Sequence, residues 1–112
     1  MSIAGDLIRG HTDAIILARL LKNDSYGYEI NKIISTLSGG RFELKEATLY
    51  TAFKRLEDLG YIASYWGDSG AGARRRDYTL TPSGRDASRR LHVEWMETKE
   101  IMDKLLETGN QI

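Results

Sequence analysis

The last part of the chain constrains its fold most, because no helix-breaking residue follows Gly84 as far as Glu107. Thr81 and the only proline, Pro82, stand in the order of an N-cap residue and a first helical residue. The pattern predicts one helix over residues 82 to about 107, roughly 26 residues or about 39 Å long at 1.5 Å per residue. A chain of 112 residues builds one small core, and this helix is too long to be covered by it.

Apolar side chains recur along one side of this predicted helix, and a lone helix cannot bury them. We therefore predict a two-fold homodimer in which the helix pairs with its copy, with help from apolar residues near the N-terminus. Trp95 serves either as an anchor of this interface or as the wall of a ligand pocket, and the sequence leaves both interpretations open. The predicted dimerisation residues are Ile3, Leu7, Ile8, Leu91, Trp95, Met102, Leu105 and Leu106.

Three shorter stretches of apolar residues at helical spacing precede the long helix. They predict helices over residues 13–21, 26–37 and 46–59, with residues 23–25 supplying turn and N-cap chemistry before the second helix. Two segments rich in β-favouring residues, 61–66 and 75–80, flank a polar, glycine-containing loop over residues 67–73. This arrangement predicts a two-stranded hairpin with a long tip.

Three helices followed by a hairpin form the element order of a winged helix-turn-helix domain. We expect a mainly α fold with a small two-stranded β wing, an α+β arrangement. Residues 1–81 are predicted to form the winged helix-turn-helix DNA-binding domain and residues 82–112 the C-terminal dimerisation helix, together one compact unit. In this architecture the third helix enters the major groove of DNA and the hairpin touches the flanking backbone.

The third predicted helix carries polar side chains on the face away from its apolar stripe. Ala47, Thr51, Lys54 and Asp58 lie opposite that stripe, and Thr48, Tyr50 and Arg55 flank them. Such a face is also common on an ordinary solvated helix. Tyr50 favours a partner slightly, because a large aromatic side chain at this position is either half-packed or available for contact.

Charge is distributed unevenly, although 16 basic and 16 acidic residues cancel in the whole chain. Residues 72–92 contain six arginines and two aspartates, a net charge of +4, whereas five acids and two lysines give residues 94–107 a net charge of −3. Arg74, Arg75 and Arg76 stand directly after the predicted hairpin tip. A run of arginines beside such a tip favours phosphate contact over a purely salt-bridged surface.

Other function classes find little support in the sequence. The chain has no cysteine, no long apolar span and no signal-peptide pattern at its start, so we expect a cytoplasmic protein without a membrane partner. His11 and His92 are isolated, and no phosphate-binding glycine loop or nucleophile pattern is present. We therefore expect no enzymatic activity, no metal and no cofactor.

Several motifs together resemble those of the PadR-like transcriptional regulators. The similarity extends over about residues 12–85, and the combination is more specific than any one piece. The motifs are DSYGYEI at 24–30, ATLY at 47–50, KRLEDLGYI at 54–62 and RRRDYTLTPSG at 74–84. Ala47 and Thr51 stand where the family commonly has glycine and proline, so we expect the third helix to start earlier than in relatives.

The resemblance implies a dimeric winged-helix repressor that binds double-stranded DNA. The two-fold symmetry of the predicted dimer indicates a near-palindromic operator, with half-sites about 34 Å apart or a multiple of that. In the compact branch of the family, some members bind planar aromatic compounds between subunits, beside a tryptophan whose position Trp95 matches. The alternative is a winged-helix module for protein–protein interaction without specific DNA binding. The residues predicted to contact DNA are Ser25, Tyr26, Thr48, Tyr50, Thr51, Lys54, Arg55, Arg74, Arg75 and Arg76.

Overall fold

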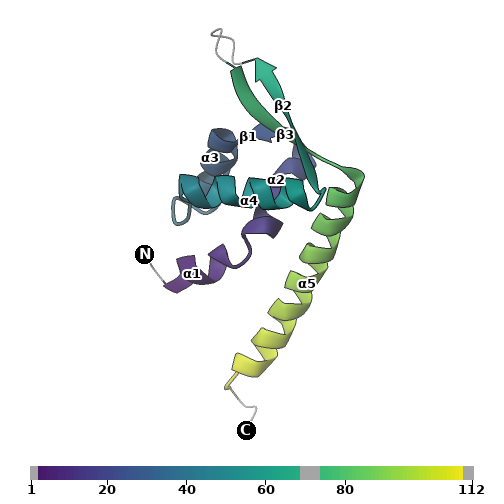
Figure 1. Ribbon diagram of the computed structural model, residues 1–112. Coiled ribbons are helices and arrows are strands. Elements are labelled where there is room, and N and C mark those ends of the chain that lie inside the picture. Colours follow the sequence, from purple (N-terminus) through teal and green to yellow (C-terminus); the bar gives the residue numbers. More distant parts are fainter. Residues whose placement is uncertain (1–2, 69–73, 110–112) are drawn as a thin grey trace.

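A computed structural model describes residues 3–68 and 74–109, which form five helices and three strands (Figure 1). α4 crosses the front of the molecule in this view, the β2–β3 hairpin rises above it, and α5 extends away from the body (Figure 1). The mainly helical winged-helix architecture predicted from the sequence is confirmed. The elements are α1 (Ile3–Arg9), α2 (Thr12–Lys22), β1 (Ser25–Tyr26), α3 (Gly27–Leu37), α4 (Glu46–Asp58), β2 (Ile62–Asp68), β3 (Arg74–Leu80) and α5 (Pro82–Leu106).

The core lies among α2, α3 and α4 and is closed by the base of the hairpin. Phe53 of α4 is almost fully buried and stacks on Tyr78 of β3, with ring centroids 4.0 Å apart. This contact fixes the hairpin against α4. Most residues of the predicted apolar stripes are buried, namely Ile16, Leu17, Leu20, Ile30, Ile34, Leu49, Ala52 and Leu56, whereas Leu21 and Leu37, also predicted to be part of them, are exposed.

The prediction of a two-stranded sheet was wrong in one respect, because the sheet has three antiparallel strands in the order β1-β3-β2. Ser25 pairs with Tyr78 and Tyr26 pairs with Asp77. Ser25 was predicted to belong to the turn and N-cap and Tyr26 to begin the following helix, but Tyr26 is the N-cap of α3 and no side chain caps that helix. Two residues are too few to display the alternation by which a strand is predicted. β1 is extended because it pairs with β3, and its own sequence does not specify that conformation.

The N-terminal segment forms a further helix, α1, which periodicity did not predict. Seven residues leave too short a window for a helical pattern to be distinguished. Thr12 starts α2 directly afterwards, and its buried hydroxyl donates a 2.7 Å hydrogen bond to the carbonyl oxygen of Arg9. The junction between the two helices is thereby held together.

α5 begins as predicted, with Thr81 as N-cap and Pro82 in the first turn. The Thr81 hydroxyl accepts a 3.0 Å hydrogen bond from the Gly84 amide and donates one of 2.6 Å to the Gly60 carbonyl. Only the first turns of α5 contribute buried residues, and the helix then leaves the core and ends at Leu106. The expectation that the core cannot cover this helix is therefore met, whereas the division of the chain after residue 81 remains a prediction.

None of the helices in residues 3–68 and 74–109 combines the length and apolar character that crossing a bilayer requires.

Candidate DNA-binding surface

α4 presents the predicted polar face to the outside. Ala47, Thr51 and Lys54 are exposed, and Thr48 is half-buried at the edge of that face. α4 begins at Glu46, one residue before Ala47, and passes through Thr51 without a break. Threonine hydroxyls and a lysine on an exposed helix can bond both base edges and phosphates.

Tyr50 is half-packed and half-exposed, with 47% of its surface accessible. Its ring meets Phe53 edge to face at a centroid distance of 5.6 Å. Its hydroxyl lies against Gly27, where an added Cβ would be only 2.7 Å away, so a larger residue there would displace the tip of the Tyr50 ring. Tyr50 therefore fixes the start of α3 against α4 while leaving part of its ring available to a partner.

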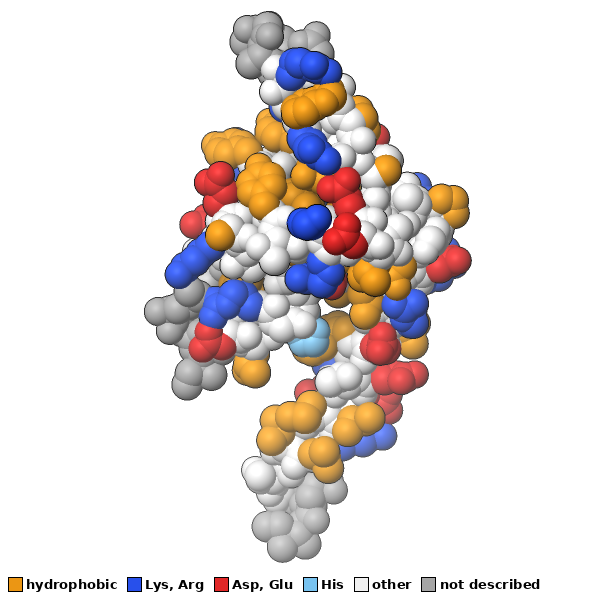
Figure 2. All heavy atoms as spheres, viewed as in Figure 1, with side chains coloured by type: hydrophobic (Ala, Val, Ile, Leu, Met, Phe, Trp, Pro, Cys, Tyr) orange, Lys and Arg blue, Asp and Glu red, His pale blue; other side chains and the backbone are white. Residues whose placement is uncertain are grey.

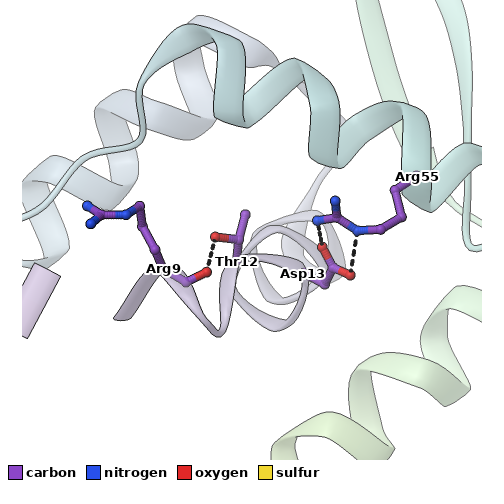
Figure 3. Close-up of polar contacts among 4 residues, drawn as sticks. All are labelled: Arg9, Thr12, Asp13 and Arg55. Atoms are coloured by element: carbon purple, nitrogen blue, oxygen red, sulfur yellow. Dashed lines mark hydrogen bonds and ion pairs between the residues drawn. The ribbon is translucent and has the colours of Figure 1, made fainter. Parts of the chain in front are cut away.

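Arg55 forms a two-point ion pair with Asp13 of α2 (Figure 3). Its Nε donates a 3.1 Å hydrogen bond to Oδ2, and its Nη2 donates to Oδ1. The hydrogen bond to Asp13 raises the pKa of Arg55, so the guanidinium remains charged. The structure thus gives this predicted DNA-contact residue a partner inside the protein, where it ties α4 to α2.

The three arginines of the wing occupy different environments. Arg75 donates a 2.9 Å hydrogen bond from Nε to the nearly buried Asp77 and lies over the ring of Tyr26 at 4.4 Å. The hydrogen bond that Arg75 donates to Asp77 raises the pKa of Arg75. The charge of Arg75 is therefore balanced by Asp77. The net charge of residues 72–92 does not reveal which arginine has this partner.

Arg74 and Arg76 lie on the opposite face of β3 from Arg75, as strand alternation predicts. Arg76 faces Trp66 across the hairpin in the strand register. The guanidinium carbons of Arg74 and Arg76 lie 4.9 and 5.9 Å from the Trp66 ring centroid. We call these three residues the Trp66 cluster. Trp66 was not among the predicted site residues. Because Trp66 lies two residues after Ser64 on the same strand, strand alternation could have placed both side chains on one face of the hairpin.

Glu57 connects α4 to this face of the wing. Its Oε2 accepts a 3.0 Å hydrogen bond from the Ser64 hydroxyl and lies 3.6 Å from Nη2 of Arg76. The Trp66 cluster therefore continues the side of the hairpin that faces α4. Figure 2 shows arginine and lysine side chains over the wing and over the face that α4 occupies, with acidic side chains among them.

Ser25 and Tyr26, also predicted to contact DNA, are held by the protein. Ser25 is buried and donates a 2.5 Å hydrogen bond to Oε1 of Glu29. Tyr26 is half-buried beneath Arg75. These positions support the wing and the start of α3, and a direct contact of either residue with DNA remains a prediction.

The predicted dimerisation residues leave an unpartnered apolar surface on the described chain. Leu7, Ile8, Trp95, Met102, Leu105 and Leu106 are exposed and Leu91 is half-buried, whereas the Ile3 side chain lies outside the described residues. An open groove of about 640 Å³ runs between α1, α2 and α3 on one side and α5 on the other. Trp95 borders this groove, and its ring meets His11 edge to face at 5.2 Å.

A helix-turn-helix whose second helix is exposed, joined to an arginine-bearing hairpin, defines a winged-helix protein of the DNA-binding type. The sequence also matches a family model described as the PadR-like family of transcriptional regulators over residues 16–90. The chain belongs to the PadR-like family, whose members are DNA-binding transcriptional regulators. The resemblance found in the sequence motifs is thereby confirmed.

Individual relatives agree with this assignment. A protein of Lysinibacillus sphaericus described as uncharacterized is 45% identical over 105 residues, which cover 94% of this chain and 96% of the relative. A transcriptional regulator from Clostridium thermocellum is 43% identical with a TM-score of 0.85, covering 95% of this chain and 100% of its own. A PadR family transcription regulator from Clostridium difficile is 38% identical with a TM-score of 0.75, covering 87% and 99% of the two chains.

Proposed function

We propose that the protein is a sequence-specific DNA-binding repressor that acts as a homodimer on a near-palindromic operator. The observation that carries this proposal is the exposed α4 face, where Thr51 and Lys54 stand beside the accessible half of Tyr50. Family membership supports repression of transcription and ascribes no catalytic role to the chain. Because the three relatives described above come from bacteria, whose DNA lies in the cytoplasm, the proposal implies a cytoplasmic location.

The proposed contact surface is narrower than the set predicted from sequence. Direct contacts are assigned to two sets of residues. They are Thr48, Tyr50, Thr51 and Lys54 on α4, and Arg74 and Arg76 on the wing. Arg55, Arg75, Ser25 and Tyr26 are assigned the role of positioning residues. Arg55, Arg75 and Ser25 donate hydrogen bonds to carboxylates of the protein, and Tyr26 lies beneath Arg75. The pairs of Lys54 with Asp58 and of Arg76 with Glu57 are longer, at 3.8 and 3.6 Å, and leave both cations exposed. Base edges would be read from the first half of α4, where small and hydroxyl-bearing side chains allow close approach.

The dimer is supported by the apolar surface of α5, which the chain itself does not cover. Two-fold pairing through this surface would place two copies of α4 on one side of a duplex. Half-sites separated by about 34 Å, or a multiple of that, are expected from this symmetry.

We also propose that a planar aromatic ligand releases the protein from its operator. Two hollows that share Trp95 as a lining residue support this proposal. One is the apolar groove beside α1 and α2, and the other, of about 580 Å³, is also lined by Asp13 and Arg55. A ligand beside Trp95 would thus adjoin the ion pair that ties α4 to α2. Titrating 2-naphthoate, a planar aromatic anion that the DNA phosphates repel, into the Trp66→Phe variant, which retains Trp95 as its sole tryptophan, tests this. We expect quenching and a weaker operator complex, whereas unchanged emission and affinity would contradict ligand control.

The function is tested by selecting binding sites from genomic DNA and measuring affinity by fluorescence anisotropy across a salt series. Lys54→Ala should weaken binding to the selected duplex and lower the dependence of log K on log salt by about 0.9. Lys104→Ala, which removes an equally exposed charge near the end of α5, is the matched control and should change neither. Failure to select any duplex, together with a stable protein partner, would favour the interaction-module alternative instead.

A further inference from the structure

Trp66 is a large aromatic side chain that the fold leaves outside its core. It is 57% exposed, whereas Ile62 on the same strand and Tyr78 on the next are buried. Ile62, Ser64 and Trp66 share one face of β2 by strand alternation, and only the first two reach the body of the protein or α4. Because more than half of its surface stays in contact with solvent, the Trp66 indole adds little to the stability of the monomer.

Two cations flank this ring. The guanidinium groups of Arg74 and Arg76 lie within 6 Å of the ring centroid, the range of a favourable cation–π contact. Such contacts do not themselves neutralise the arginines. Arg76 also pairs with Glu57 at 3.6 Å, a longer contact than the 2.9 Å pair of Arg75 with Asp77. The Trp66 cluster therefore offers a flat apolar surface bordered by positive charge.

The position of the cluster indicates what that surface faces. Glu57 of α4 bonds Ser64 and lies next to Arg76, so the cluster is on the side of the wing that adjoins the recognition helix. A duplex lying along the exposed face of α4 would pass this side of the wing. Deoxyribose rings and phosphates complement an apolar plane flanked by guanidinium groups.

We propose that Trp66 is a further DNA-contact residue, whose indole packs on the sugars of the backbone next to the site read by α4, while Arg74 and Arg76 bind the adjoining phosphates. This inference rests on the proposed DNA-binding function. It divides the contribution of the wing into two parts, because phosphate contacts weaken with salt whereas packing of an apolar ring on sugar does not.

Binding measurements with Trp66→Ala and Trp66→Phe separate these parts. We expect Trp66→Ala to raise the Kd for the selected duplex about tenfold, the scale of a lost aromatic anchor, with an unchanged salt slope. Trp66→Phe, which keeps a ring, should stay within about threefold of the wild type. Arg74→Ala should instead lower the salt slope by about 0.9. Thermal unfolding of each variant shows whether the fold is intact.

Fluorescence gives a second measurement. In the Trp95→Phe variant, Trp66 is the sole tryptophan, since the chain contains two. We expect its emission to change on adding the selected duplex and to remain constant on adding a duplex trimmed to the bases that α4 covers.

The outcomes distinguish this inference from the function on which it rests. If Trp66→Ala binds like the wild type while Lys54→Ala loses affinity, the role of Trp66 is overturned and the DNA-binding function stands. If the wild type itself fails to discriminate between duplexes, both are overturned.

Discussion

Arg55 and Asp13 lie 42 residues apart in the chain, yet the guanidinium of one bonds both carboxylate oxygens of the other (Figure 3). The pair joins α4 to the first turn of α2. Both side chains remain partly exposed, so solvent screens the attraction and limits its effect on stability. Its main consequence is geometric, because it fixes the orientation of α4 relative to the helix that packs against α5.

A double-mutant cycle tests this relationship. We expect Asp13→Ala and Arg55→Ala each to lower the free energy of unfolding, with a coupling of roughly 0.5–1 kcal/mol. If Arg55 acts by positioning α4, both variants should weaken operator binding similarly. A loss confined to Arg55→Ala, with a lower salt slope, would show instead that Arg55 binds a phosphate directly. Asp58→Ala, which breaks the more exposed 3.8 Å pair with Lys54, is the control for stability.

The wing arginines should differ in their contribution to DNA binding. Arg75 and Asp77 form a local pair, so the variant Arg75→Ala/Asp77→Asn removes one charge of each sign. We expect its salt slope to match the wild type, in contrast to the fall expected for Arg74→Ala. Anisotropy titrations at four or more salt concentrations measure the slopes. A fall of about 0.9 in the double variant would mean that Arg75 reaches a phosphate despite its partner.

The environment of Arg75 shows what sequence reasoning reached and what it left undetected. Strand alternation correctly placed Arg74 and Arg76 on one face and Arg75 on the other. The same alternation puts Asp77 beside Arg75, so this pair could have been predicted. The partner of Arg55 could not, because nothing local relates residues 42 apart whose contact depends on how two helices pack.

The fold was more predictable than the site, for a related reason. The Leu49, Phe53 and Leu56 stripe and the Thr81 cap are local patterns, and the structure confirms both. β1 exists only because β3 offers a partner strand to two residues, so it is a tertiary feature without a local signature. Ser25 illustrates the effect on the site, since pairing in that strand buries a residue predicted to face DNA.

Dimerisation should depend on the exposed apolar residues of α5. Light scattering at micromolar concentration should give twice the chain mass of 12.7 kDa for the wild type. Met102→Glu/Leu105→Glu should give the single-chain mass, because two carboxylates would be buried in the paired surface. Lys104→Glu, on the same part of the helix but outside the stripe, should remain dimeric. A wild-type protein of single-chain mass would contradict the proposed assembly.

The entry into α5 should tolerate no side chain at Gly84. A Cβ built there would lie 1.9 Å from the Tyr61 carbonyl oxygen, so Gly84→Ala must push the helix away from the turn after α4. We expect a loss of about 1–3 kcal/mol in the free energy of unfolding, the usual cost of overpacking. Urea denaturation measures it, with the exposed neighbour Ser83→Ala as control. Equal stability of the two variants would show that this contact is not tight.

Stability at high pH should report the burial of Tyr78. Burial raises the pKa of its phenol above the usual value, although the nearby Arg76 lowers it in part. Below about pH 10 the phenol is protonated in both folded and unfolded chains, and above it the unfolded chain loses the proton first. The free energy of unfolding should therefore fall as pH rises above about 10. The fall should be smaller in Tyr78→Phe and unchanged in Tyr28→Phe, which alters an exposed ring.

Sequence-specific binding of duplex DNA is tested most directly by the ratio of two dissociation constants for the wild-type protein. One is measured with the genomically selected duplex and the other with a scrambled duplex of equal length and composition, both at physiological salt. We expect the selected duplex to bind at least about 10³ times more tightly, as specific regulators do. Equal affinity for the two duplexes would contradict a sequence-reading role for α4.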